Sequence, residues 1–182
     1  MRIEILDLNE RTLPLAPELD RFPYSCKYCL YWEHPEKLYE NSPGFEERAL
    51  EEKREWVKNA ERKFGTCGKI LFADGKAAVY SQYGPPAFFP NTEGYSSGPP
   101  SEDAVFLACL FVGKREYRGL GLGSKLLVTI LEELRGRGFR AAETLARKEG
   151  LENPSGPVEL YLSHEFFILR DDPEYPLMRL DL

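Results

Sequence analysis

The feature that most constrains the fold is a glycine-rich run between an apolar stretch and a helical pattern. The run is Arg118-Gly-Leu-Gly-Leu-Gly123. It follows the unbroken apolar segment Ala104–Val112, which is typical of a strand buried on both faces. Over residues 124–135, leucine and isoleucine recur at helical spacing, and Gly136 and Gly138 then favour a helix end. The sequence therefore predicts a buried strand, a tight turn and an amphipathic helix in succession.

The glycine run has the chemistry of an anion-binding turn. Gly119, Gly121 and Gly123 allow the backbone to turn sharply and to approach a ligand closely, because glycine has no Cβ. The first N–H groups of the following helix lack partners within the helix, and the helix dipole adds positive charge there. We therefore expect this turn to bind a cofactor that carries phosphate.

Two common phosphate-binding motifs do not fit this run. A P-loop has the order Gly-Lys-Ser/Thr, whereas this chain has Gly123-Ser124-Lys125. A dinucleotide-binding loop has a third glycine at the place of Ser124, counted from Gly119, and it usually lies in the first strand–helix–strand unit of a domain. Here several strand-like segments precede the run, so both motifs are disfavoured.

Two segments resemble one known family. The pattern Arg118-x-x-Gly121-x-Gly123, between a buried strand and a leucine-rich helix, resembles the R/Q-x-x-G-x-G/A loop of the GNAT superfamily of acyl-CoA-dependent N-acetyltransferases. The segment Tyr161-Leu-Ser-His-Glu-Phe166 is similar to the family's Y-x-x-x-G-F segment, with Glu165 in place of glycine. Because a left-handed backbone is unfavourable for glutamate, we expect a different helix-to-strand turn there.

The remaining pattern agrees with the order of elements in that family. Asp74-Gly75 is typical of a two-residue hairpin turn. We expect strands at 2–8, 66–73, 76–83, 104–112, 139–146, 166–170 and 177–182, helices at 46–64, 124–135 and 158–165, a short helix within 26–39 and a long loop at 84–103. The resemblance implies one α/β (α+β) domain over residues 1–182, with a mixed, mostly antiparallel sheet, splayed middle strands and flanking helices.

The resemblance also implies acetyl-CoA as cosubstrate and assigns its contacts. In such a fold the backbone of the core strand, here Leu110, Phe111 and Val112, holds the pantetheine arm. Asn153, one position before the family's usual asparagine, is a further candidate for a cofactor contact. The pyrophosphate would meet the backbone of Arg118, Gly119, Leu120, Gly121, Leu122, Gly123 and Ser124, and the Arg118 side chain would contact it or order the loop.

The implied reaction is direct attack of a neutral amine on the thioester in a ternary complex. Tyr161 is the candidate acid that protonates the departing thiolate, and its alternative role is packing against the sheet. Glu143, an acid among apolar neighbours, is the candidate base. Two alternatives stay open: the Glu143 side chain faces solvent, or an ordered chain of water molecules acts as the base.

Charge and hydropathy restrict the partners. The net charge of −6 disfavours nucleic-acid binding and suits a cationic acceptor, either a small-molecule amine or a protein amino group. We expect acceptor specificity to lie in 26–39 and 84–103. No apolar run is long enough to span a membrane and the N-terminus lacks a signal pattern, so a cytoplasmic monomer or homodimer is expected.

The cysteines leave two alternatives open. Cys26 and Cys29 form a C-x-x-C pair that, with His34 and Cys67, could offer zinc ligands or a reactive dithiol. The chain has no second C-x-x-C pair, and Cys109 lies in the apolar strand, so we expect no metal site. The alternatives to an enzyme are therefore a zinc or redox module and a non-catalytic acyl-CoA-binding regulatory domain.

Overall fold

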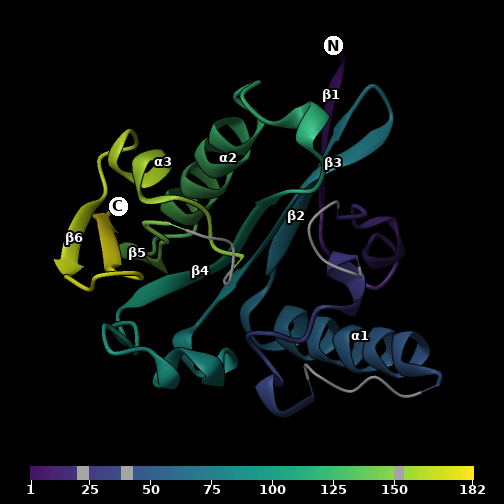
Figure 1. Cartoon of the computed structure of the whole chain (residues 1–182), viewed down its shortest axis with the longest axis horizontal. Coiled ribbons are helices and arrows are strands. Elements are labelled where there is room, and N and C mark those ends of the chain that lie inside the picture. Colours follow the sequence, from purple (N-terminus) through teal and green to yellow (C-terminus); the bar gives the residue numbers. More distant parts are fainter. Residues whose placement is uncertain (20–24, 38–42, 150–153) are drawn as a thin grey trace.

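The computed structural model describes residues 1–19, 25–37, 43–149 and 154–182. Its sheet has the order β1-β2-β3-β4-β5-β7-β6, in which only β4 and β5 are parallel (Figure 1). The strands are β1 (Ile3–Asp7), β2 (Gly68–Ala73), β3 (Lys76–Gly84), β4 (Ala104–Val112), β5 (Ala141–Leu145), β6 (Phe167–Arg170) and β7 (Leu177–Asp181). The helices are α1 (Phe45–Phe64), α2 (Leu122–Gly136) and α3 (Val158–Leu162). The expected mixed, mostly antiparallel sheet is confirmed.

Local turn chemistry explains two of the sharp connections. Asp74 and Gly75 both have positive φ, 49° and 78°, as a two-residue hairpin between right-twisted strands requires. Helix α2 ends because Gly138 adopts φ 80°, while the N–H of Phe139 donates to the carbonyl of Leu134 at 3.1 Å. The predicted hairpin and helix end are both confirmed.

Two expected segments differ from the structure. In the described part of 26–39 there is no α-helix, only the 3₁₀ turns η2 (Cys26–Tyr28) and η3 (Pro35–Lys37). The segment 84–103 is more ordered than the expected loop, because it contains the turns η4 (Pro86–Phe88) and η5 (Pro90–Gly94). Phe89 between them is fully buried and anchors the segment in the core.

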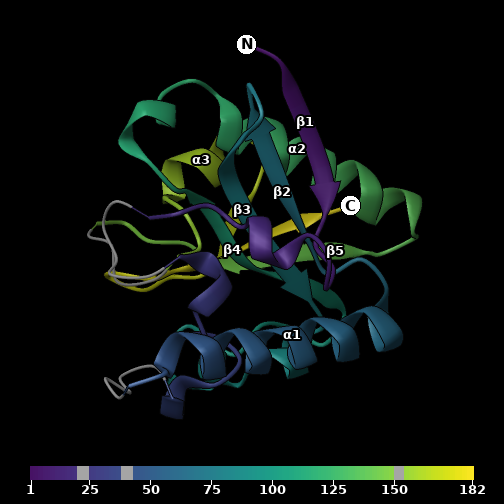
Figure 2. The same cartoon turned by 90° about the vertical axis from the view of Figure 1, so that its right-hand side faces the viewer.

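Two hydrophobic cores lie on opposite faces of the sheet. Helices α2 and α3 cover one face and α1 covers the other, as Figure 1 shows. In Figure 2 the axis of α1 runs across the direction of β2 and β3. The apolar face of α2 is buried through Leu126, Leu127, Ile130, Leu131 and Leu134. No helix in the described ranges is long and apolar enough to cross a membrane.

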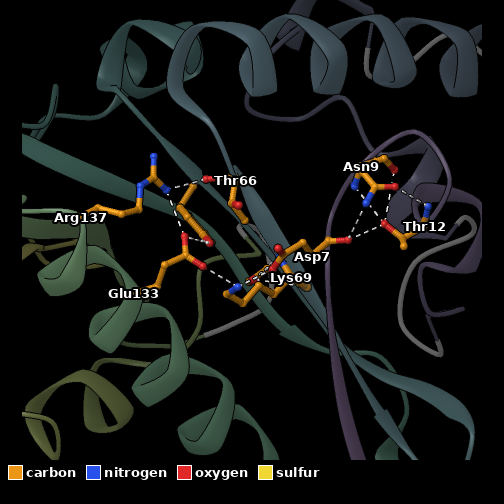
Figure 3. A network of polar contacts seen from close by, with 9 residues as sticks. Asp7, Asn9, Thr12, Thr66, Lys69, Glu133 and Arg137 are labelled. Carbon is orange, nitrogen blue, oxygen red and sulfur yellow. Dashed lines mark hydrogen bonds and ion pairs between the residues drawn. The ribbon is translucent and has the colours of Figure 1, made fainter.

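A polar network fixes α2 against the sheet (Figure 3). Lys69 on β2 contacts the carboxylates of Asp7 and Glu133, each at 2.5 Å. Burial lowers the pKa of Lys69, but its hydrogen bonds to these two carboxylates outweigh burial and raise the pKa above its ordinary value. Arg137 donates to Glu133 at 3.0 Å and to the carbonyl of Thr66 at 2.9 Å. The network therefore joins α2 to β1, β2 and the segment after α1.

This network predicts a stability loss in Glu133→Gln. Neutralising Glu133 removes one of the two carboxylates that compensate the buried Lys69 charge, which should lower the free energy of unfolding by about 1 to 3 kcal/mol. Urea denaturation measures the change. Glu132→Gln is the matched control, because Glu132 is exposed on the same helix and should change stability by less than about 0.5 kcal/mol. Equal effects of the two substitutions would contradict the role given to the network.

Candidate active site

The centre of the sheet opens where β4 and β5 separate. Their parallel pairing covers three residues of each strand and ends at Phe106 and Glu143, although β4 continues to Val112. Beyond that point the segment 154–157 lies beside β4, and the N–H of Leu110 donates to the carbonyl of Pro154 at 3.1 Å. The splayed middle strands expected from the sequence are therefore present.

The backbone of Val112 faces this opening. Successive residues of a strand direct their N–H and C=O groups to alternate sides. Leu110 bonds toward the split, whereas Gly113 donates to the carbonyl of Ala78, in the adjacent strand β3, at 2.9 Å. The polar backbone groups of Val112 therefore point into the split, as those of Leu110 do.

The glycine run forms a tight turn that leads into α2. Gly119 and Gly121 both have φ 73°, a left-handed conformation that residues with a Cβ rarely adopt. Helix α2 begins at Leu122, two residues before the predicted Ser124, and no side chain caps its N-terminus. Its first backbone N–H groups are therefore available to an external acceptor.

A pocket of about 340 Å³ joins the split to the start of α2. The pocket brings together predicted cofactor residues from β4 and from the glycine run. Leu120, whose side chain is half exposed, does not line it. Asn153 lies outside the described residues. The lining comprises Leu110, Phe111, Val112, Tyr117, Arg118, Gly119, Gly121, Leu122, Gly123, Ser124, Arg147, Pro157 and Leu160.

Four residues of the pocket lining were not predicted from the sequence, namely Tyr117, Arg147, Pro157 and Leu160, and Arg147 is the charged one among them. Its N–H donates to the carbonyl of Gly156, and its carbonyl accepts the N–H of Val158, both at 3.0 Å. These bonds fix its backbone while the residue lines the pocket with Arg118. A basic residue directly after the strand beside the split was the available signal, but the partner segment 154–158 had no recognisable pattern.

Tyr161 is buried below the split. Its hydroxyl donates to the carbonyl of Ser155, and burial raises its pKa well above the ordinary value. A Cβ added to Gly156 would lie 3.4 Å from both the Tyr161 hydroxyl and the Leu110 carbonyl, so these groups flank one narrow space. Tyr161 is not among the residues that line the pocket. Its catalytic role stays a prediction.

The turn after α3 corrects one expectation. Glu165 adopts φ 66°, the left-handed conformation that the family's glycine would take. The N–H of Phe166 donates to the carbonyl of Tyr161 at 3.1 Å, and the N–H of Glu165 donates to the carbonyl of Leu162 at 3.3 Å. These two bonds form a Schellman motif, so the turn is kept despite the glutamate.

This turn predicts that Glu165→Gly stabilises the protein. A left-handed backbone costs a residue with a Cβ about 1 to 2 kcal/mol, and glycine removes this cost. Part of the gain in stability is offset, because glycine has greater conformational freedom in the unfolded chain. We expect unfolding free energy to rise by about 0.5 to 1 kcal/mol. Glu159→Gly, which removes the same charge inside α3, should instead destabilise, and thermal unfolding of both variants measures the two signs.

Glu143 has contacts that favour a structural role over that of the base. It is fully buried, and its carboxylate accepts hydrogen bonds from Arg179 at 2.8 Å and from the N–H of Ser101 at 2.7 Å. Arg179 also binds Asp103 through two hydrogen bonds. Because both oxygens of its carboxylate are engaged by Arg179 and by the N–H of Ser101, we do not propose Glu143 as the base.

Cys26, Cys67 and Cys109 are buried and Cys29 is half-buried, and the charge of Lys53 acts on all four thiols. All four thiols are free, and burial raises the pKa of the Cys67 thiol to about 12 and that of Cys26 still further. Lys53 contacts Glu33 and donates to Gln82 at 2.8 Å. Raised pKa values disfavour a reactive dithiol. Within the described ranges, no three His, Cys, Asp or Glu side chains are grouped to hold a metal ion.

Comparison with known proteins identifies the family. The model of the acetyltransferase (GNAT) family matches residues 28–155. The chain belongs to the GNAT family. None of the curated proteins compared with this GNAT chain matches it significantly. The family supports an acyltransferase activity.

Solved structures support the GNAT fold at low sequence identity. PaiA N-acetyltransferase from Thermoplasma acidophilum, in complex with coenzyme A, is 14% identical with a TM-score of 0.60, and all of both chains is covered. The ribosomal-protein-S18-alanine N-acetyltransferase from Escherichia coli is 16% identical with a TM-score of 0.57, covering 99% of this chain and 94% of that one. An N-acetyltransferase from Staphylococcus aureus Mu50 is 13% identical with a TM-score of 0.60, covering 100% and 99%.

Proposed function

We propose that this GNAT protein transfers an acetyl group from acetyl-CoA to an amine. The observation that carries the proposal is that one continuous pocket joins the split beside β4 to the uncapped start of α2. Family membership supports acyl transfer, and the Thermoplasma acidophilum protein of the same fold has been solved with coenzyme A. Acetyl-CoA would supply the activated thioester.

The pocket suits a pyrophosphate at one end and an amide-bearing arm at the other. Free N–H groups at the start of α2 and the positive end of the helix dipole favour a negative group. Arg118 and Arg147 add two positive charges to the same pocket. At the other end, the backbone of Val112 offers a donor and an acceptor toward the split, which match the amides of pantetheine.

The chemistry assigned to this chain's residues is limited to one proton transfer. The Tyr161 hydroxyl is protonated at neutral pH and flanks the same narrow space as the Leu110 carbonyl, so Tyr161 would donate its proton to the departing thiolate. Water would accept the proton that the attacking amine loses as the N–C bond forms and the C–S bond breaks. We assign no side chain as base, because the carboxylate of Glu143 is engaged by Arg179.

Arg147→Met should weaken acetyl-CoA binding. Loss of a positive charge from the pocket lining should raise the dissociation constant at least about tenfold, since a charged hydrogen bond contributes about 1.5 to 3 kcal/mol. Isothermal titration calorimetry measures the change. Lys148→Met is the matched control, because the neighbouring Lys148 is exposed and pairs with Asp171 at 2.9 Å. Unchanged affinity in Arg147→Met would exclude Arg147 from the cofactor site.

Tyr161→Phe should slow acetyl transfer while leaving acetyl-CoA affinity within about twofold. Loss of a general acid lowers turnover by about 100-fold or more, whereas the ring and its packing on Phe166 remain. The rate of thiol release from acetyl-CoA, measured over a panel of amines, gives the comparison. Unchanged turnover would remove Tyr161 from the mechanism. Tight cofactor binding without thiol release in the wild type would instead favour a non-catalytic acyl-CoA-binding domain.

A further inference from the structure

A second pocket, of about 500 Å³, has tyrosines in its wall and lies outside the cofactor pocket. Its walls come from three distant parts of the chain: Tyr31 before η3, Tyr95 after η5, and Tyr175 with Asp172 and Glu174 in the connection between β6 and β7. We call it the tyrosine pocket. Its first two walls belong to the segments in which acceptor specificity was expected.

The tyrosines are held in place by one another. The hydroxyls of Tyr31 and Tyr95 share a hydrogen bond. The rings of Tyr95 and Tyr175 meet edge to face, with centroids 5.3 Å apart at an interplanar angle of 85°. Asn91 donates from its side chain to the carbonyl of Tyr31 at 2.7 Å, which fixes that wall as well. The aromatic faces are therefore arranged before any ligand binds.

The tyrosine pocket carries negative charge. Asp172 and Glu174 line it, and none of the described residues in its lining is basic. The carboxylate of Asp172 accepts hydrogen bonds from the Ser96 hydroxyl and from the N–H of Tyr175, and these bonds lower its pKa, the Ser96 bond most strongly. It is therefore ionised at neutral pH. Carboxylates beside aromatic faces favour an organic cation.

One short segment borders both pockets. Arg147 lines the cofactor pocket and bonds toward Gly156. The N–H of the following residue, Lys148, donates to the carbonyl of Glu174 at 2.8 Å on the other side. Two adjacent residues just after β5 therefore connect the lining of the cofactor pocket to that of the tyrosine pocket.

We propose that the tyrosine pocket binds a second ammonium group of the acceptor, so that the preferred substrate is an alkyl diamine or polyamine. The amine that attacks the thioester must be neutral, whereas a negative aromatic pocket keeps its occupant protonated. The group in the pocket is therefore a positioning cation, while a different nitrogen of the same molecule attacks. This inference rests on the proposed acetyl transfer and names its acceptor class.

The test compares α,ω-diamines of three to eight carbons with alkyl monoamines of the same lengths. Thiol release from acetyl-CoA should give a kcat/KM at least about tenfold higher for the best diamine than for its monoamine. The ratio of kcat/KM for the diamine to kcat/KM for the monoamine should fall with added salt and approach one in Glu174→Gln. This preference should also be lost in Tyr175→Leu and kept in Tyr175→Phe. Equal kcat/KM values for diamines and monoamines in the wild type would overturn the inference and leave acetyl transfer standing.

Calorimetric titration of the coenzyme A complex with the best diamine separates the two proposals. Diamine binding that is weakened at least about tenfold in Glu174→Gln supports the tyrosine pocket even if no amine is acetylated, in which case only the proposed function fails. Glu93→Gln is the control, because Glu93 is an acid of η5 that does not line the pocket. If coenzyme A binds but no diamine binds, the inference is wrong.

Discussion

The short parallel pairing of β4 with β5 is the constraint on which the rest of the site depends. A buried strand must find partners for its backbone polar groups. After Phe106, β4 no longer pairs with β5, although β3 still pairs with it on the other side. Leu110 is satisfied by Pro154, whereas Val112 is left facing the pocket. The segment that fills the split is itself held, because the Ser155 hydroxyl donates to the carbonyl of Leu145 and the Tyr161 hydroxyl donates to the carbonyl of Ser155. The pocket is thus a consequence of where the pairing stops.

Helix α2 brings the second half of the site to this split. Its apolar face fixes its rotation, and the contact of Glu133 with Lys69 and the bond of Arg137 to the Thr66 carbonyl fix its position on the sheet. At the other end of α2, Gly123 lies next to Val112, since a Cβ on Gly123 would be in ordinary contact, at 3.8 Å, with the Val112 side chain. The glycine turn therefore places unpaired N–H groups beside the open end of β4.

Much of this could be predicted because the signals are local. The apolar run of β4 and the Asp74-Gly75 hairpin depend on neighbouring residues, and the splay followed from the family resemblance. The short helix expected within 26–39 is present in the described residues only as two three-residue 3₁₀ helices, and buried aromatics such as Trp32 contact distant residues there. The turn at Glu165 was also misjudged, since its Schellman bonds compensate the strained backbone. Arg147 and the tyrosine pocket depend on long-range contacts that have no sequence pattern.

We propose that one acyl-CoA molecule occupies the pocket between the split and the start of α2. Hydrogen–deuterium exchange with and without acetyl-CoA tests it most directly, because each backbone amide reports its own protection. We predict that acetyl-CoA slows exchange in 110–112 and 119–125, with little change in the exposed strand β6. Protection confined to other segments, or none at saturating acetyl-CoA, would contradict the account.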